Sequence, residues 1–366
     1  MAFCKENLYG YDILAAVYIA ATIIIARIYD FKINFSLVFA SKYDIKFMKL
    51  VILFIALDSL VILLQVHRKR RVERKTRLFR TLVARKYLNF RQLFHIFKVL
   101  LWLKLVLFAY CNIKQAIPFI NPHIYDNLLL KADRFMFFGH DAYAVLIAMF
   151  GNPVVTALID KLYVLWYIVK PFVLVYFASL PVRASVAHKR FFLAYFAMWI
   201  FGGLSAVLLP SLGPIYFYPD AYSHIVKPYA TRLQTNLGIH YFDALRHPHS
   251  YKVFIYEGIA AFPSLHVGII AVFAFFLYKR SRTIGWLMFG YLLIIQIGSV
   301  VLGWHYFIDG LFAIALAFLF YKLTEKIIPG GSVALDAAAT EGPLSPLEEE
   351  PGGSDSATGD ATGTSA

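Results

Sequence analysis

Three long apolar stretches follow one another in FPSLHVGIIAVFAFFLYKRSRTIGWLMFGYLLIIQIGSVVLGWHYFIDGLFAIALAFLFYKL, residues 262–323. They cover residues 262–278, 284–303 and 305–323, and each approaches the length of about 20 residues that an α-helix needs to cross a bilayer. Only the basic run KRSR with Thr283, and the single residue Trp304, separate them. The stretch therefore predicts three membrane-spanning helices in succession.

Five further apolar stretches precede this region, and the overall composition agrees with them. The 366-residue chain is 60% hydrophobic, whereas a soluble domain averages about 45–50%. Its mean hydropathy is +0.64. We therefore predict an all-α integral membrane protein with eight spans, the first five at 11–28, 47–66, 93–112, 153–179 and 190–210. The shorter apolar segment 141–151 is expected to lie in the membrane interface or to re-enter.

Basic residues in the links between spans predict the orientation, because Lys and Arg concentrate in cytoplasmic loops. The densest cluster lies at 67–91, after the second span, and alternation places 180–189 and 279–282 on the same side. Both termini are then cytoplasmic. The three longest links face the extracytoplasmic side, which is periplasmic or lumenal: 29–46, 113–152 and 211–261.

These patterns divide the chain into three parts. Residues 1–92 hold two membrane helices and the basic cytoplasmic loop, and residues 93–328 hold six spans that would form a catalytic helix bundle. Residues 329–366 are poor in apolar bulk and rich in Gly, Ser, Thr and Pro, which predicts a disordered cytoplasmic tail. Within the second part, the segment 120–143 has apolar residues at helical spacing and is expected to lie as an amphipathic helix along the outer membrane surface.

The formal net charge of +14 does not indicate a protein that binds nucleic acid. The basic residues sit between apolar spans, where anionic lipid headgroups and membrane topology explain them. Cys4 and Cys111 are far apart and suggest neither a disulfide framework nor a thiolate metal site. The sequence also lacks a Walker loop, a dinucleotide fingerprint, HExxH and CxxC, so we expect no metal and no cofactor.

Two short motifs carry residues suited to chemistry: AFPSLHVG at 261–268 and GSVVLGWHYFIDG at 298–310. The orientation predicted from charge alone places both at the extracytoplasmic face. His305 and Asp309 are four residues apart, so on a helix they lie on one face. A carboxylate that accepts a proton from one imidazole nitrogen fixes the tautomer and leaves the other nitrogen free to attack. His305 is therefore the candidate nucleophile and Asp309 its orienting carboxylate.

The first motif supplies groups that suit a phosphate. Pro263 fits the first turn of a helix, and the free N–H groups there, with the Ser264 hydroxyl, suit a phosphate oxygen. His266 would point into the same site and protonate a departing alkoxide. Together these residues describe a two-step phosphoryl transfer through a phosphohistidine, without an obligatory metal.

The two motifs resemble the second and third signatures of the type 2 phosphatidic acid phosphatase (PAP2) superfamily. The second signature reads PSGH in the family, and Leu265 stands in place of its Gly. In the third, S-R-x5-H-x3-D, the His and Asp match His305 and Asp309. The first two positions of that signature are Gly298 and Ser299 in this chain.

The resemblance covers residues 93–323 and implies a six-helix PAP2-like bundle beside the two N-terminal helices, with His266 as the proton donor. The family's phosphate-binding Arg is missing from the third signature, and the first signature, K-x6-RP, is not found. PSLH with the Ser299 hydroxyl in place of that Arg resembles the inositol phosphorylceramide synthase-like, or inositolphosphotransferase, branch. The segment YDNLLLKADRFMFFG at 125–139 is also similar to that branch.

Since the family's basic phosphate ligands are missing, other cations must neutralise the phosphate. By the predicted topology the nearest are Arg134, Lys161 and Arg232. Ser264 and Ser299 complete the expected phosphate-binding set. Lys170 is excluded, because it falls towards the cytoplasmic end of its predicted span.

The resemblance implies a reaction in which His305 attacks the phosphorus of a membrane phospholipid or of a polyprenyl or sphingoid phosphate. His266 would protonate the leaving alcohol. An alcohol acceptor or water would then attack the phosphohistidine. The resemblance thus implies one of two activities. The first is a phosphotransferase that moves a headgroup such as phosphoinositol, and the second is a lipid phosphate phosphatase. A lipid transporter or scramblase is the alternative from another class, and His305→Ala would leave its lipid movement intact.

Overall fold

The computed structural model describes residues 9–35, 42–68, 75–88, 90–180, 186–246 and 258–329. Within these ranges the chain forms helices and no strand, which confirms the predicted all-α fold. The predicted disordered tail lies outside the described residues, apart from its first position.

The helices follow one another along the described chain, with η2 a π-helix and η3 a 3-10 helix. They are α2 (Gly10–Ile28), α3 (Lys42–Arg68), α4 (Lys75–Val83), η2 (Ala84–Leu88), α5 (Phe90–Ile120), α6 (Asp126–Met136), α7 (Ala142–Phe150), α8 (Pro153–Val164), α9 (Trp166–Ala178), α10 (Val186–Leu208), α11 (Pro214–Phe217), η3 (Pro219–Tyr222), α12 (Ala230–Arg246), α13 (Leu265–Arg280), α14 (Arg282–Val301) and α15 (Phe307–Ile327).

Six helices of the described chain are long and apolar enough to cross a membrane, and each overlaps a predicted span. They are α2, α3, α5, α10, α14 and α15. The helix α7 and the helix Pro153–Ala178 are together apolar enough, but they are bent by 110° at their break, as in a broken span or a re-entrant loop. This bend agrees with the expectation that 141–151 lies in the interface or re-enters. The chain is thus a multi-pass membrane protein.

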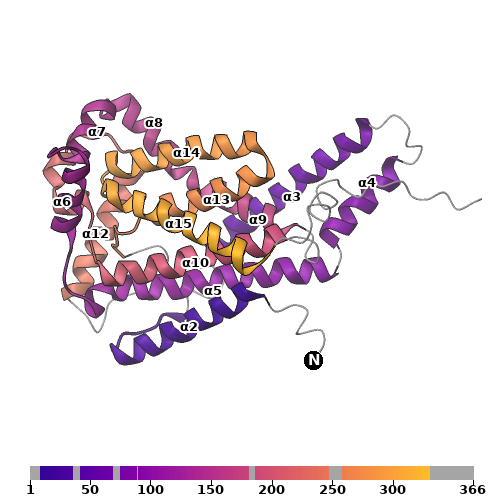
Figure 1. Ribbon diagram of the computed structural model, residues 1–366, viewed down its shortest axis with the longest axis horizontal. Coiled ribbons are helices and arrows are strands. Elements are labelled where there is room, and N and C mark those ends of the chain that lie inside the picture. Colours follow the sequence, from indigo (N-terminus) through magenta and orange to yellow (C-terminus); the bar gives the residue numbers. More distant parts are fainter. Residues whose placement is uncertain are drawn as a thin grey trace, which may run out of the picture.

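The predicted span at 262–278 is the exception in length. Its helix, α13, has 16 residues, which is about 24 Å at the α-helical rise. That is shorter than a helix needs to cross the hydrocarbon by itself. α13 packs against α10, α14 and α15 at the centre of the bundle (Figure 1). Every residue from Val267 to Ala274 is buried, so this helix is surrounded by protein.

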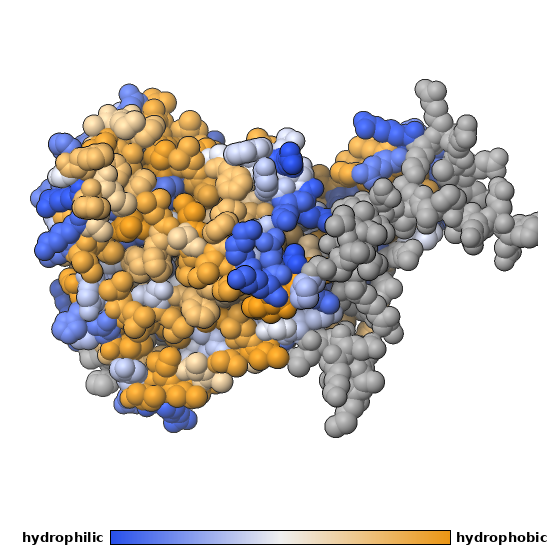
Figure 2. Space-filling view, viewed as in Figure 1, coloured by the Kyte–Doolittle hydropathy of each residue, from blue (hydrophilic) through white to orange (hydrophobic). Residues whose placement is uncertain are grey.

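The surface of the bundle is apolar between its two ends. Figure 2 shows hydrophobic side chains covering most of the visible bundle, with hydrophilic residues gathered towards the ends. Large side chains on the long helices contribute to this surface, among them Leu60 of α3 and Trp286, Leu287 and Leu293 of α14. An apolar surface of this extent fits contact with lipid, since soluble proteins rarely expose large contiguous apolar patches.

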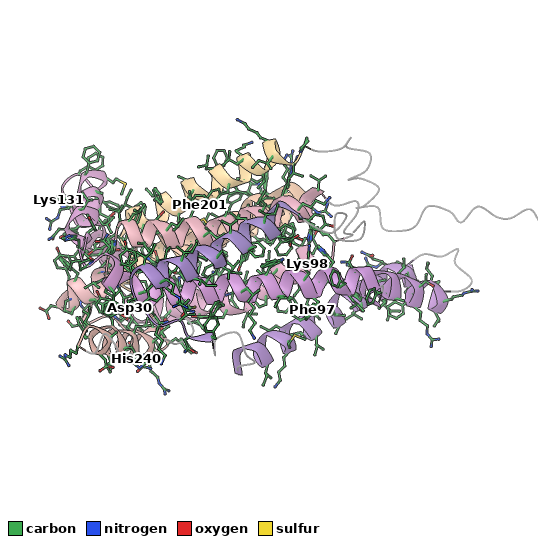
Figure 3. The ribbon with its side chains drawn as sticks, turned by 90° about the horizontal axis from the view of Figure 1, so that it is seen from below. Asp30, Phe97, Lys98, Lys131, Phe201 and His240 are labelled. Atoms are coloured by element: carbon green, nitrogen blue, oxygen red, sulfur yellow. The ribbon has the colours of Figure 1, made fainter. Side chains whose placement is uncertain are left out.

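Both sequence motifs lie at one end of the bundle, which we call the motif end. It holds the start of α13, the end of α14 and the short helices α6, α7 and α12 (Figure 1). Figure 3 shows Lys131 of α6 and His240 of α12 at this end, whereas Lys98 of α5 lies towards the other. The opposite end carries the basic residues that close the long helices, such as Lys322, which pairs with Glu325. The motifs and this basic end are therefore separated by the length of the bundle.

The helix α2 is joined to the bundle by buried polar contacts as well as by apolar packing. The Lys98 ammonium of α5 lies 2.7 Å from the Asp12 carboxylate of α2. Nearby, the Nε2 atoms of His95 and His188 are 2.6 Å apart, and the Tyr11 hydroxyl lies 3.3 Å from His188. These contacts connect α2, α5 and α10 towards the end opposite the motifs.

Candidate active site

His305 lies in the turn between α14 and α15. Gly303 shapes this turn with φ +83°, a conformation that favours glycine. The backbone N–H groups of Trp304 and His305 both donate to the Ser299 carbonyl, at 2.9 and 3.1 Å. The imidazole Nδ1 lies 2.6 Å from the carbonyl oxygen of Ala261. Because a carbonyl can only accept, Nδ1 carries the hydrogen and Nε2 has a free lone pair.

Asp309 lies beside the Nδ1 edge of the His305 ring. Its Oδ2 is 3.6 Å from His305 Nδ1, so the two residues that the i, i+4 spacing paired are close in space. The same oxygen accepts the backbone N–H of Tyr306 at 2.9 Å and thereby caps α15. The Asp309 side chain is fully buried. The hydrogen bond that fixes the tautomer therefore goes to Ala261, while Asp309 supplies a negative charge beside it.

His266 occupies the first turn of α13 and faces His305. The two ring centroids are 6.2 Å apart. Two aromatic side chains from the α8–α9 segment hold the His266 ring in place: Trp166 with a centroid separation of 4.7 Å and Tyr163 with one of 5.0 Å. The structure thus brings His266, His305 and Asp309 to one place, although they come from two motifs.

Ser264 is the N-cap of α13, where its hydroxyl oxygen accepts the Val267 N–H at 3.5 Å. Its own backbone N–H donates to the Asp309 carbonyl at 3.2 Å and so ties the start of α13 to α15. Pro263 precedes this cap and does not occupy the first helical turn. The Ser299 hydroxyl donates to the Gln296 carbonyl at 2.8 Å. A phosphate-binding role for Ser264 and Ser299 stays a prediction.

The three cations chosen from the sequence lie on the surface. Arg134 is hydrogen-bonded to Asp141, and about half of its side chain is exposed. Lys161 and Arg232 are both exposed. Within the described ranges, no observed contact joins any of the three to His305 or His266. Their proposed phosphate contacts therefore stay a prediction.

Two other lysines act electrostatically on His266, namely Lys114 of α5 and Lys170 of α9. Only 8% of Lys170 is exposed, and its ammonium lies 4.1 Å above the Trp166 ring that packs on His266. Lys114 has no hydrogen-bonded or ion-paired acceptor among the described residues. Lys170, which was excluded because of its expected position in the span 153–179, therefore lies over an aromatic ring that packs on His266.

A buried carboxylate of helix α6 binds the chain just after the turn that carries His305. Asp133 accepts the backbone N–H groups of Phe307 and Ile308, each at 2.8 Å. These are the first two residues of α15, so Asp133 satisfies donors that a helix start leaves without an intrahelical partner. Burial raises the pKa of Asp133 to about 7, and the charges of Asp309 and Asp141 act in the same direction.

A second acid of α6 holds the loop that leads into the site. Asp126 accepts the backbone N–H groups of Leu212 and Gly213, both at 2.9 Å. The Tyr306 hydroxyl donates to the same carboxylate at 2.9 Å. The sequence offered one signal for this role. Asp126 and Asp133 are seven residues apart, on the same helical face as the buried Leu129 and Leu130.

The site therefore contains an unprotonated imidazole nitrogen, a second imidazole facing it, a buried carboxylate and two lysine charges. Such a set can attack phosphorus, donate a proton and stabilise the negative charge of a phosphate. Within the described ranges, no group of three or more His, Cys, Asp or Glu side chains could hold a metal ion.

Comparison with known proteins agrees with this geometry. A family model described as the PAP2 superfamily matches residues 127–323, from α6 to α15. The match includes both motifs but not Lys114. No curated protein and no solved structure matches the chain. Membership of this superfamily supports an enzyme activity of phosphatase or phosphotransferase type on lipid phosphates. The match covers more than half of the 366-residue chain, so the chain belongs to the PAP2 superfamily.

Proposed function

We propose that the protein is a membrane phosphotransferase that moves a phosphoalcohol headgroup from a lipid-linked donor to an alcohol acceptor. The observation that carries this proposal is the 2.6 Å contact between His305 Nδ1 and the Ala261 carbonyl. This contact holds the proton on Nδ1 and leaves Nε2 as a nucleophile. The Nε2 atom attacks phosphorus, the N–P bond forms and the P–O bond to the lipid alcohol breaks.

Proton transfer is assigned to His266. As the P–O bond breaks, His266 gives its proton to the departing alkoxide and becomes neutral. It then takes the proton of the acceptor hydroxyl, whose oxygen attacks phosphorus and breaks the N–P bond. The phosphorylated His305 ring carries positive charge, and the Asp309 carboxylate at 3.6 Å from Nδ1 stabilises it. The two steps restore both histidines.

Lys114 and Lys170 are proposed to neutralise the phosphate. The family's basic ligands are missing from the third motif, and these two lysines act on the same His266 ring. A bound phosphate between them would also favour the protonated form of His266, because a nearby negative charge stabilises an imidazolium. The site is therefore primed to become a proton donor when the donor lipid arrives.

Transfer is preferred over hydrolysis because the third motif has a Ser, Ser299, where phosphatases of the family have Arg. This substitution and the segment 125–139 resemble the inositol phosphorylceramide synthase-like branch, so phosphoinositol is the first headgroup to test. The site is proposed to face the extracytoplasmic side, where the predicted topology puts both motifs.

The test uses the purified full-length chain in lipid nanodiscs with a phospholipid donor labelled in its phosphate. Phosphatidylinositol serves as the first donor, and ceramide, diacylglycerol and phosphatidylglycerol are compared as acceptors. We expect label to appear in the acceptor, and a labelled protein intermediate that is stable to base and lost in acid. His305→Ala should remove both signals, and His266→Ala should slow both steps by at least about 100-fold.

The outcomes separate the candidate functions. Labelled inorganic phosphate with no labelled acceptor would make the protein a phosphatase. Lipid movement between leaflets that persists in His305→Ala, with no chemistry in either protein, would favour a transporter or scramblase. Lys131→Met is the control, because Lys131 is exposed and its loss should leave transfer unchanged.

A further inference from the structure

A cavity lies beside the turn that carries His305. It has a volume of about 540 Å³ and is bounded by α11, by the loop before α12 and by one face of α12. Small-molecule sites commonly have volumes of about 300–1,000 Å³. Neither His305 nor His266 lines this cavity, so it is separate from the site described above.

The inner wall of the cavity is hydrogen-bonded to the turn that carries His305. Ile215 donates its backbone N–H to the Gly303 carbonyl at 3.0 Å. The Gln234 amide donates to the Leu302 carbonyl at 2.8 Å, and Gln234 in turn accepts the Tyr216 hydroxyl through its backbone carbonyl. A ligand in the cavity therefore lies against the residues that immediately precede Trp304 and His305 in the chain.

A buried lysine lines this cavity. Only 8% of Lys227 is exposed, and its ammonium has no hydrogen-bonded or ion-paired acceptor in the part of the chain that the structure describes. Asp160 acts on it electrostatically, but that carboxylate accepts the backbone N–H groups of Tyr229 and Ala230. Burial lowers the pKa of Lys227. A buried cation of this kind is stabilised when an anion enters beside it.

Asp243 lines the cavity beside Arg246, and most of the other polar groups suit hydroxyls. Thr231 and Thr235 are one turn apart on α12, and each hydroxyl oxygen keeps lone pairs after donating to a backbone carbonyl. Gly238 continues this face without a side chain, and a Cβ there would lie 3.3 Å from the Tyr216 ring. Arg246 lines the cavity at the end of α12. Lys227 and Arg246 thus flank a row of hydroxyl-binding groups.

From this arrangement we infer that the cavity binds the headgroup of the acceptor, and that this headgroup bears both hydroxyls and an anionic group, as in a phosphorylated sugar or polyol. The inference rests on the proposed transfer at His305. Lys227 and Arg246 hold the anionic group, and Thr231, Thr235 and Gln234 hold the hydroxyls. One hydroxyl of the same headgroup is presented along the turn Leu302–Gly303 to the phosphohistidine.

The test measures binding, so that it does not depend on catalysis. Glucose 6-phosphate is titrated into the full-length protein in nanodiscs of neutral lipid, and the dissociation constant is measured by calorimetry. A second arm uses nanodiscs that contain phosphatidylglycerol, whose headgroup has the same chemistry on a lipid, and follows its competition with the sugar phosphate. Competition identifies a lipid headgroup as a ligand, and binding without competition identifies a free sugar phosphate.

Variants locate the binding. Lys227→Met should weaken glucose 6-phosphate binding by at least about tenfold, since it removes a charge-assisted contact. Thr235 is exposed, so Thr235→Leu changes no buried residue, and its larger side chain fills part of the cavity. It should weaken binding equally, and it tests the site even if Lys227→Met folds poorly. The matched control for Thr235→Leu is Asn236→Leu, since Asn236 is exposed on α12 but does not line the cavity. Its affinity should match the wild type.

His305→Ala separates this inference from the proposed function. Unchanged sugar phosphate binding in that variant supports a distinct cavity, whether or not the wild type transfers phosphate. The inference is overturned if Lys227→Met and Thr235→Leu bind like wild type. It is equally overturned if inorganic phosphate binds as tightly as glucose 6-phosphate, or if neither arm shows binding.

Discussion

Lys114 acts on His266 from α5, a helix that lies before the segment matched by the superfamily. Lys114 is half-buried, and a lysine within a membrane-spanning helix is costly and tends to mark a functional site. Lys170 reaches the same ring from α9 across Trp166. Two helices therefore bring positive charge to a histidine whose sequence neighbours are apolar.

Lys114→Met should lower kcat/KM for the donor lipid by about 10- to 100-fold, because a charge-assisted contact to phosphate contributes about 1.5–3 kcal/mol. Lys114→Arg should restore part of the loss. Lys131→Met is the matched control, since Lys131 is exposed, and it should leave kcat/KM unchanged. Initial rates with labelled donor measure the effect. Equal losses in Lys131→Met and Lys114→Met would remove the assignment.

The sequence predicted the His305–Asp309 pair because an i, i+4 spacing fixes a shared helical face. It did not reveal that Ala261 accepts the Nδ1 proton. A backbone carbonyl has no residue type, and 44 residues separate Ala261 from His305 along the chain. Hydropathy also did not reveal that Lys170 lies over the Trp166 ring that packs on His266.

At the scale of the element, α6 stabilises the chain on both sides of the turn that carries His305. The sequence predicted an amphipathic helix in 120–143, and α6 lies within it. Its two buried acids accept backbone N–H groups on either side of the catalytic turn: Asp126 from the loop before α11, and Asp133 from the first turn of α15. Such caps depend on where the partner loops fold, which periodicity does not describe.

Asp133→Asn should remove the pH dependence of stability that Asp133 contributes, because an amide does not ionise. The pKa of Asp133 is raised to about 7 in the folded state, so its protonated form favours folding. That contribution is complete below about pH 4 and is lost as the pH rises through about 7.

Thermal unfolding in detergent between about pH 4 and 8 measures this difference. Wild type should lose stability relative to Asp133→Asn over that range. Asp141→Asn is the control, since Asp141 pairs with the exposed Arg134 and its loss should shift the melting temperature little. Parallel pH curves for wild type and Asp133→Asn would contradict the raised pKa.

At the scale of the whole molecule, the basic residues and the motifs occupy opposite ends of one bundle. The distribution of Lys and Arg along the sequence predicts that the basic links and the motifs lie on opposite sides of the membrane. The fold agrees in so far as it separates them along the bundle. The order of the spans can be predicted from the sequence because each apolar stretch must be long enough to cross the hydrocarbon. The broken segment at 142–178 and the short α13 depart from that rule, since both are shaped by neighbouring helices.

The predicted orientation can be measured by cysteine labelling in intact cells, after Cys4 and Cys111 are replaced by alanine. A membrane-impermeant maleimide should label His123→Cys, an exposed position at the motif end, without lysis. Lys326→Cys, exposed at the opposite end, should be labelled only after permeabilisation. The reverse pattern would place the motifs in the cytoplasm.

The burial of α13 has a consequence for how the enzyme depends on its lipid surroundings. Hydrophobic matching to bilayer thickness acts on helices that touch acyl chains. In α3, for example, only 11% of the apolar window is buried, so this helix must tilt or shift when the bilayer thickens. α13 has protein on all sides and has no such length to match. Changes in acyl-chain length should therefore move the periphery of the bundle while the spacing between His266 and His305 is kept.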